Sequence, residues 1–196
     1  SGIPFLTPGA VNNGGEIVGS QWTHGKPDLP DTIGFLLKKD GIVDALLPPY
    51  SPGNASEWIV HSAVNSGFGI NNRGDLFFPI KRTPAEKNSY DFAGTIIVYA
   101  DGERIDLDTG ERGRWANGVQ INDNGVLAGN AYGPDRERGF IYSRQKGLRY
   151  IDEIFSEYNE GSEVRVIGLS NAGEVLMEVR SKSSESKETL LRKVLG

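Results

Sequence analysis

Short polar turns, each closed by a glycine and flanked by apolar residues, recur along this chain. The clearest copy is Ile-Asn-Asp-Asn-Gly-Val-Leu-Ala-Gly at 121–129, and its relatives lie at 11–19, 70–77 and 169–176. Asparagine and glycine tolerate positive φ, so such a turn reverses the chain between two strands at low strain. The repeated motif therefore predicts a series of β-hairpins.

The turn glycines are Gly15, Gly74, Gly125 and Gly173, which gives intervals of 59 (74−15), 51 (125−74) and 48 (173−125) residues. A period of this order is typical of β-propeller blades and related β arrays rather than of helical solenoids. A second glycine turn lies between apolar runs in the first three repeats, at 40–41, 101–102 and 146–147. Asp-Gly between apolar runs is a strong hairpin signal.

Each repeat is therefore expected to form four antiparallel strands, except that the last repeat stops after its third. The second strands are predicted to begin at Glu16, Asp75, Val126 and Glu174, and the third strands near Thr32, Gly94, Gly139 and Glu188. We predict a single all-β domain, a β-propeller or an arc of one, built from four units at about 1–50, 51–109, 110–155 and 156–196.

Composition narrows the function classes. The chain has 196 residues, 26 of them glycine and none cysteine, and a net charge of −5. The charge balance argues against nucleic acid as a partner, and no apolar run approaches the ~20 residues that cross a bilayer, so no membrane insertion is expected. The absence of cysteine excludes disulfides, thiolate zinc sites and cysteine nucleophiles, and is unremarkable in an exported bacterial domain.

The repeated pattern resembles the bacterial HAF repeat, which is found in extracellular proteins. Two copies carry the resemblance best: 121–129 followed by Gly-Phe-Ile-Tyr at 139–142, and 11–19 followed by Gly-Phe-Leu-Leu at 34–37. The other two copies have Phe-Phe-Pro at 77–79 and Leu-Met-Glu at 176–178 in place of Val-x-Gly. The resemblance implies a repeat architecture and an extracellular or periplasmic location.

A function is expected at the end of the array opposite the polar turns. The long connections gather there, and loops on a regular scaffold are where binding residues concentrate. Their predicted ranges are 20–31, 48–62, 81–92, 109–117, 130–138, 156–163 and 181–187. The candidate ligand-binding residues in or beside them are Trp22, His24, Trp58, His61, Tyr90, Arg114, Trp115, Tyr132 and Arg136. Aromatic rings beside charged groups stack on sugars or grip peptides, although such rings also bury themselves between blades.

The preferred prediction is an exported, non-catalytic module that binds a glycan or a protein. A propeller-type hydrolase or lyase acting on an extracellular polymer, or a structural segment of a larger surface protein, is the alternative. No cofactor and no metal is expected: a site of His24, His61 and one carboxylate, or of oxygen ligands at 106–111, is less favoured than solvated turns. Arg73-Gly74-Asp75 spells an adhesion tripeptide but is interpreted as part of a hairpin.

Overall fold

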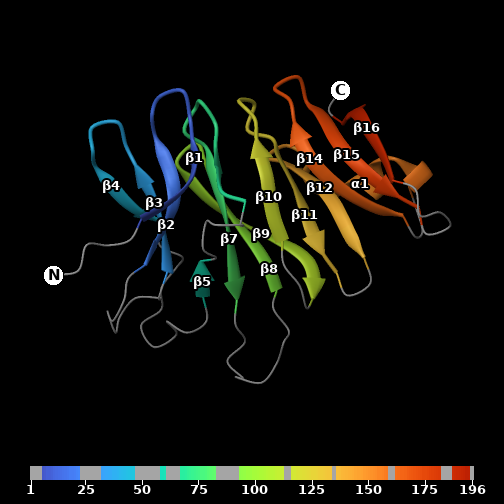
Figure 1. Cartoon of the computed structure of the whole chain (residues 1–196), viewed down its shortest axis with the longest axis horizontal. Helices are drawn as coiled ribbons and strands as arrows, with labels where there is room; N and C mark the ends of the chain where they lie inside the picture. Colours follow the sequence, from blue (N-terminus) through green and yellow to red (C-terminus); the bar gives the residue numbers. More distant parts are fainter. Residues whose placement is uncertain are drawn as a thin grey trace.

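The molecule, in a computed structural model, is built almost entirely of β-strands. The structure describes residues 6–22, 32–46, 58–60, 67–82, 93–112, 116–133, 136–158, 162–181 and 187–194. Within these ranges the strands form three sheets. The sheets lie side by side in chain order, from β1–β4 at one end of the molecule to β14–β16 at the other (Figure 1). The predicted all-β class is confirmed.

The first strand group is an antiparallel meander in the order β1-β2-β3-β4. The second group places β7 and β8 side by side, with β5 and β6 both paired to the free side of β7 and β9 beyond β8. The bounds are β1 (Leu6–Val11), β2 (Ile17–Trp22), β3 (Thr32–Leu37), β4 (Val43–Leu46), β5 (Trp58–Val60), β6 (Gly69–Ile70), β7 (Leu76–Arg82), β8 (Ala93–Ala100) and β9 (Glu103–Arg112).

The third and fourth strand groups belong to one sheet, in which a single parallel bridge between Arg138 and Val164 joins two antiparallel meanders. The third group is β10 (Ala116–Ile121), β11 (Leu127–Tyr132), β12 (Glu137–Ser143) and β13 (Gly147–Tyr150), followed by the helix α1 (Ile151–Ile154) and the 3₁₀ turn η2 (Ser156–Tyr158). The fourth group is β14 (Glu163–Leu169), β15 (Glu174–Arg180) and β16 (Lys187–Lys193).

Both kinds of predicted turn are present. The glycines of the polar turns, Gly15, Gly74, Gly125 and Gly173, have φ values of +80°, +87°, +73° and +79°, and those of the second turns, at 41, 102 and 147, have +84°, +76° and +68°. These values lie in the left-handed region that glycine adopts without strain. The second strands begin within one residue of their predicted starts.

Several predicted connections are wrong because the strands run further than the turn residues suggest. β9 continues through 109–112, β11 reaches Tyr132 and β12 begins at Glu137, so parts of the connections expected at 109–117 and 130–138 are strand. β5 falls inside the connection expected at 48–62. Backbone pairing with a neighbouring strand extends these segments despite their polar residues, as tertiary context often overrides local preference.

The fourth strand of the third unit is short and is followed directly by a helix. β13 ends at Tyr150, and Ile151 begins α1. Two acidic residues in the first turn, Asp152 and Glu153, favour a helix N-terminus. The Glu153 carboxylate also accepts a hydrogen bond from the Tyr150 N–H at 3.4 Å, which caps the helix locally.

Packing explains the glycines of the repeated motif. A Cβ placed on Gly19 or Gly129 would lie 2.8 Å or 2.5 Å from the ring of Phe35 or Phe140, the residue paired with it on the next strand. In the second group Phe78 takes the glycine position and is paired with Ile97. In the fourth group Met177 is paired with Leu190. In the first and third groups the large side chain is on the third strand, opposite a glycine, whereas in the second and fourth groups a large side chain is on the second strand. The two copies that depart from Val-x-Gly therefore still fill the core.

A row of side-chain hydrogen bonds, termed here the turn ladder, joins the four polar turns. The Asn12 side-chain amide donates to the carbonyl of Asn71 at 3.0 Å, Asn71 donates to the carbonyl of Asn122 at 2.8 Å, and Asn122 donates to the carbonyl of Ser170 at 3.0 Å. Within its own turn, Asn71 Oδ1 accepts the N–H of Asp75 at 2.9 Å. Each asparagine therefore both closes a hairpin and reaches the next strand group.

A second row of the turn ladder uses the following residue of each turn. The N–H of Asn13 donates to Asn72 Oδ1 at 3.0 Å, that of Asn72 to Asp123 Oδ1 at 2.9 Å, and that of Asp123 to Asn171 Oδ1 at 3.0 Å. These hydrogen bonds hold the Asp123 carboxylate ionised: its pKa is lowered, chiefly by the Asn72 N–H and then by the Asn72 side-chain amide. The turns therefore keep a fixed spacing along the array.

Candidate binding pocket

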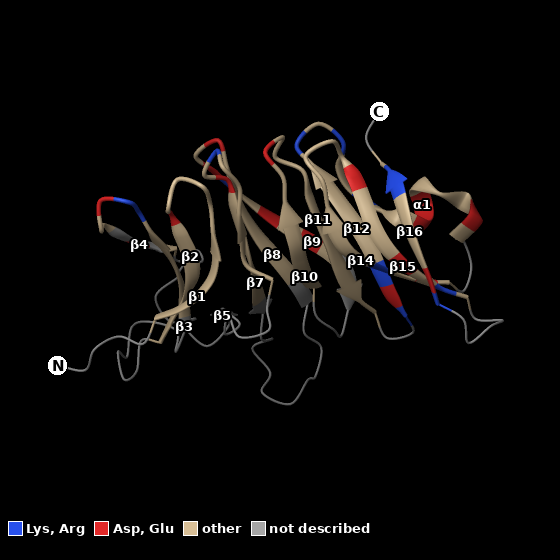
Figure 2. Cartoon of the chain, turned by 45° about the horizontal axis from the view of Figure 1, so that its top comes forward, with Lys and Arg blue, Asp and Glu red and all other residues tan. Residues whose placement is uncertain are grey.

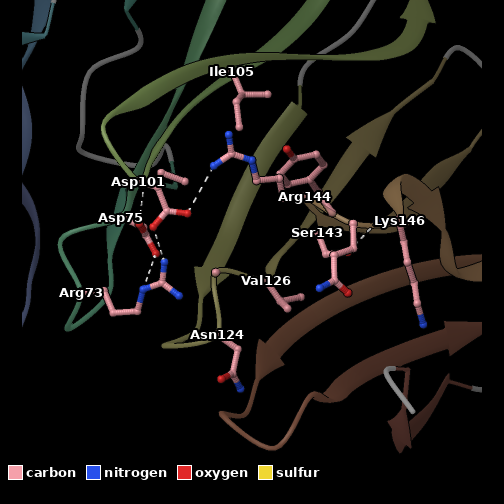
Figure 3. Close-up of a pocket in the computed structure, with 13 residues that line it drawn as sticks. Arg73, Asp75, Asp101, Ile105, Asn124, Val126, Ser143, Arg144 and Lys146 are labelled. Atoms are coloured by element: carbon pink, nitrogen blue, oxygen red, sulfur yellow. Dashed lines mark hydrogen bonds and ion pairs between the residues drawn. The ribbon is translucent and has the colours of Figure 1, made fainter.

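A pocket of about 490 Å³ opens between the second and third strand groups, at the end of the molecule that carries the turn ladder (Figure 3). One wall comes from the second group and includes Arg73, Asp75 and Asp101. The other comes from the third group and includes Arg144 and Lys146. The pocket therefore exists only because two strand groups lie side by side. Figure 2 shows acidic and basic residues together along this row of turns.

The wall of the second group is held by a buried carboxylate. Asp75 is 4% exposed and accepts hydrogen bonds from the Asn71 side chain at 2.8 Å and from the Asp101 N–H at 3.2 Å. The Arg73 guanidinium lies 3.4 Å from Asp75 Oδ2 and 2.7 Å from Asp101 Oδ1. Because Asp75 binds both the polar turn and the second turn, these two loops are fixed relative to each other.

An exposed ion-pair network links the two walls. Arg144 Nη1 lies 3.3 Å from Asp101 Oδ2, and Arg144 Nη2 also contacts the carboxylate of Glu103. Asp101 is thus shared by arginines from two strand groups, as the dashed lines in Figure 3 show. Such solvent-exposed pairs each contribute about 0–1 kcal/mol to stability. Their main effect is to fix the orientation of the guanidinium groups around the pocket.

The floor of the pocket is apolar because the third turn lacks an acidic residue found in the other three. Glu16, Asp75 and Glu174 each accept a hydrogen bond from the first side chain of their own turn, at 2.8 Å, 2.8 Å and 3.2 Å. Val126 occupies the corresponding position, lines the pocket and is buried in the core of the third and fourth groups. A carboxylate is therefore replaced by a hydrophobic surface at this one place.

The pocket is also lined by two further apolar residues and by a lysine on its basic wall. Ile105 and the mostly buried Tyr142 line the pocket beside Val126. Burial raises the pKa of the Tyr142 hydroxyl, an effect that Arg144 partly opposes, so this phenol stays neutral at physiological pH. Among the described residues, no carboxylate lies within ion-pair distance of the Lys146 ammonium, although Lys146 lines the pocket. The basic wall thus presents a cation to an incoming ligand.

At the opposite end, three of the sequence-predicted residues are described. Trp22 ends β2 and is 42% exposed, Tyr132 ends β11, and Arg136 directly precedes β12. All three therefore lie at the end of the molecule opposite the polar turns. Tyr132 and Arg136 flank one connection, whereas Trp22 belongs to the first strand group.

The neighbours of Tyr132 and Arg136 are also charged. Tyr132 is paired across β11 and β12 with Glu137, whose pKa is raised, chiefly by burial. Arg136 lies 2.8 Å from the buried carboxylate of Asp152, which Arg138 contacts at 2.7 Å. Arg136 therefore contributes to the attachment of α1, a role that competes with ligand binding.

The other predicted site residues lie outside the residues whose side chains are described: His24, Trp58, His61, Tyr90, Arg114 and Trp115. The backbone of Trp58 begins β5. Within the described ranges, no group of three or more His, Asp or Glu side chains is placed to hold a metal ion, and the acidic stretch at 106–111 is part of β9. No helix in those ranges has the length and apolar character to span a membrane.

Sequence reasoning missed the pocket at the turn end. Arg73 and Asp75 were interpreted only as hairpin residues, and Asp101 and Lys146 only as the neighbours of turn glycines. The sequence does contain one indication of this pocket, namely charged residues in both kinds of turn of adjacent repeats. They indicate a site only once the turns of neighbouring repeats are known to lie side by side.

The sequence matches no protein-family model and has no significant match among curated proteins. Among solved structures, the fold is similar to that of TolB from Acinetobacter baumannii, with a TM-score of 0.52 and 10% identity over 97% of this chain and 41% of TolB. The chain has a β-propeller-like fold. At this level of identity the likeness shows the fold alone, and the chain spans less than half the length of TolB.

Two further structures align over most of the chain with lower scores. A putative gluconolactonase gives a TM-score of 0.38 at 16% identity, over 98% of this chain and 60% of that protein. Virginiamycin B lyase from Staphylococcus aureus gives 0.34 at 12% identity, over 95% and 69%. A fold alone does not determine function, which must be argued from the site.

Proposed function

We propose that this chain is an exported, non-catalytic binding module of the β-propeller type that recognises a protein or a glycan. The proposal includes four blades, one for each strand group, within the ~4–8 blades typical of propellers. Membership in the HAF-type repeat family and an extracellular or periplasmic location are part of it and rest on the sequence motifs. The observation that carries the function is the pocket between the second and third groups, whose walls are built and cross-linked by residues of both.

Binding is favoured over catalysis by the state of the carboxylates around this pocket. A general acid or base must exchange a proton with the substrate, and glycosidases need two such groups facing the scissile bond. Asp75, Asp101 and Glu103 instead each pair with an arginine. Carboxylates paired in this way hold the arginine side chains in place, and the positioned guanidinium groups can bind a ligand.

The pocket favours a protein ligand, whereas the opposite end retains the features that favour a glycan. Sugar rings stack on exposed aromatic faces, and Tyr142, the aromatic residue lining the pocket, is only 8% exposed. Trp22 is much more exposed and lies at the strand ends opposite the pocket. The two ends therefore suit different ligand classes, and the sequence-predicted residues remain the candidates for a glycan.

An array experiment tests the proposed function. The fluorescently labelled chain is applied to glycan and peptide arrays beside Ser143→Trp, which fills the pocket, and Trp22→Ala, which removes the exposed ring. We expect retained peptide ligands to be lost with Ser143→Trp and any glycan ligands to be lost with Trp22→Ala. Circular dichroism checks that both variants keep the wild-type strand signal.

The same samples address the alternatives. If wild type retains neither peptides nor glycans above background, the binding function is wrong and a structural segment of a larger surface protein becomes the better proposal. If incubation with polysaccharides releases new reducing ends or unsaturated products, the module is a hydrolase or a lyase instead.

A further inference from the structure

We infer that the pocket binds a peptide segment in which one carboxylate lies next to an apolar side chain. This deepens the proposed function and rests on it. The basic wall supplies the carboxylate partners: in the described part of the chain, Lys146 has no ion-pair partner and Arg144 forms ion pairs only with the exposed acids Asp101 and Glu103. A guanidinium has five N–H donors, so Arg144 retains donors for a ligand carboxylate.

The apolar part of the ligand is recognised by the floor. The apolar lining between the two walls consists of the half-buried Ile105 and the small exposed parts of Val126 and Tyr142. The pocket volume of about 490 Å³ falls within the range of about 300–1,000 Å³ found for ligand sites. A carboxylate held at the basic wall therefore leaves room for an adjoining side chain over Val126.

Amide groups at the rim suit a peptide backbone. Asn124 and Gln145 line the pocket, and each side chain offers a donor and an acceptor, as a peptide N–H and C=O require. The stacking surface that a sugar ring requires is missing here, because Tyr142 is mostly buried. These groups together favour a peptide as the occupant.

The opposite wall limits how much negative charge the ligand carries. Asp75 and Asp101 line it, and Glu103 lies beside them in the same ion-pair network. A second carboxylate on the ligand would approach these groups and be repelled. The site is therefore expected to accept one carboxylate and to reject polyanions such as heparin.

The test uses the full chain and defined peptides in isothermal titration calorimetry. One probe is N-acetyl-Gly-Gly-Val-Leu with a free carboxyl terminus, the second is its C-terminal amide, and the third is N-acetyl-Gly-Glu-Leu-Gly amide. The first and third probes both place a carboxylate next to leucine, the first from the chain terminus and the third from a glutamate side chain. The probe that binds more tightly shows which kind of carboxylate the pocket prefers. We expect the uncharged second probe to bind at least about tenfold more weakly than the better acid.

Two variants locate the binding. Lys146→Gln is expected to weaken the acid by about tenfold, while Lys39→Gln, an exposed lysine of the first group's second turn, leaves it unchanged. Val126→Asp restores the acidic residue that the other three turns carry and is expected to abolish binding. Because Val126 belongs to the core of the third and fourth groups, circular dichroism checks that this variant keeps the wild-type strand signal.

The inference is overturned if the better acid binds no more tightly than the uncharged amide, if Lys146→Gln binds like wild type, or if heparin competes better than the peptides. If array binding is lost with Ser143→Trp in those cases, the proposed binding function stands and only the ligand class is wrong. If wild type binds no peptide and no array ligand, both proposals fall.

Discussion

The third and fourth strand groups use the same hairpin motif but bury their strands differently. β11 is buried along nearly its whole length, with Leu127 facing the second group and Ala128 facing the fourth. β15 alternates instead: Val175 and Met177 are buried, and Leu176 between them is 37% exposed. Figure 2 shows the charged residues carried along β14 and β15. A strand group packed on both faces needs a continuous apolar sequence, and a group packed on one face needs alternation.

This difference separates an internal repeat from one that faces solvent. Repeat arrays require a terminal unit with a polar outer face for solubility. The fourth group has a polar face of that kind: Arg165 and Glu178 lie opposite each other on β14 and β15, and Arg165 also lies 3.7 Å from Glu137 of β12. The turn ladder also differs in the fourth group. Ser170 replaces the asparagine of the other turns, and its hydroxyl donates to Glu174 within its own turn, so it has no side-chain amide that could reach a further group.

The largest expected effect comes from emptying an internal packing site. Phe77 is fully buried between Gly69 and Gly118, whereas Leu191 on β16 is 55% exposed. Phe77→Ala should lower the free energy of unfolding by about 3–5 kcal/mol. Leu191→Ala should change it by no more than about 0.5 kcal/mol. Urea denaturation followed by tryptophan fluorescence measures both, and equal losses would contradict the distinction between a strand group packed on both faces and one packed on a single face.

Glycines on the first strands give a second test. A Cβ on Gly118 would lie 2.0 Å from the Phe77 ring, whereas the nearest atom to a Cβ on Gly168 of the fourth group is 3.8 Å away. Gly118→Ala should therefore destabilise by about 1–3 kcal/mol through overpacking. Gly168→Ala has room for its methyl group and should be near neutral or stabilising. Thermal unfolding by circular dichroism ranks the two, and a reversed order would refute the packing account.

The turn ladder predicts a smaller contrast. Asn71 is buried and links its own turn to Asn122, whereas Ser170 hydrogen-bonds only Glu174 through its side chain. Asn71→Ala leaves buried partners unsatisfied and should lose about 1–3 kcal/mol. Ser170→Ala should lose about 1 kcal/mol or less, because its turn is part-buried. Hydrogen exchange should show faster opening across 71–75 in the first variant, and protection there would count against the ladder.

The smallest expected effect is a pH dependence that originates at Asp123. Its pKa in the folded chain lies below the ordinary value of 3.8, so the stabilisation is present above pH 3.8 and is lost as pH falls through the lower folded value. Asp123→Asn should remove that part of the acid sensitivity, whereas Glu188→Gln, in which the acid is exposed on β16, serves as the control. Urea midpoints between pH 5 and pH 2 compare them. Identical acid profiles for wild type and Asp123→Asn would exclude this role.

The sequence was most informative where one residue determines backbone geometry. The turn glycines predicted every polar hairpin, because positive φ at positions such as Gly125 is a local requirement. The continuation of β9 through Thr109 was missed because the polar run at 109–112 resembles a loop; it remains strand because Arg112 pairs with Ala93 of β8. The helix at Ile151 was missed because its apolar residues resemble a strand end.

The candidate site was less predictable than the fold. Arg73 and Arg144 meet at Asp101, but they are far apart in sequence and belong to different repeats. The contrast between Val126 and the acidic residues of the other turns was visible in the sequence. The sequence alone does not show what this contrast means; the structure does, because Val126 lines a pocket. Residues that act through neighbouring repeats are identified only once the repeats are placed side by side.

The turn ladder also bears on how such an array grows. Asn71 receives a hydrogen bond from the preceding group at its backbone carbonyl and donates one to the following group from its side chain. One short stretch therefore carries both halves of the connection. If a gene duplication inserted a further copy of an internal group, the new turn would find a donor on one side and an acceptor on the other. An array of this kind can lengthen by whole strand groups without requiring a new type of contact between neighbouring groups.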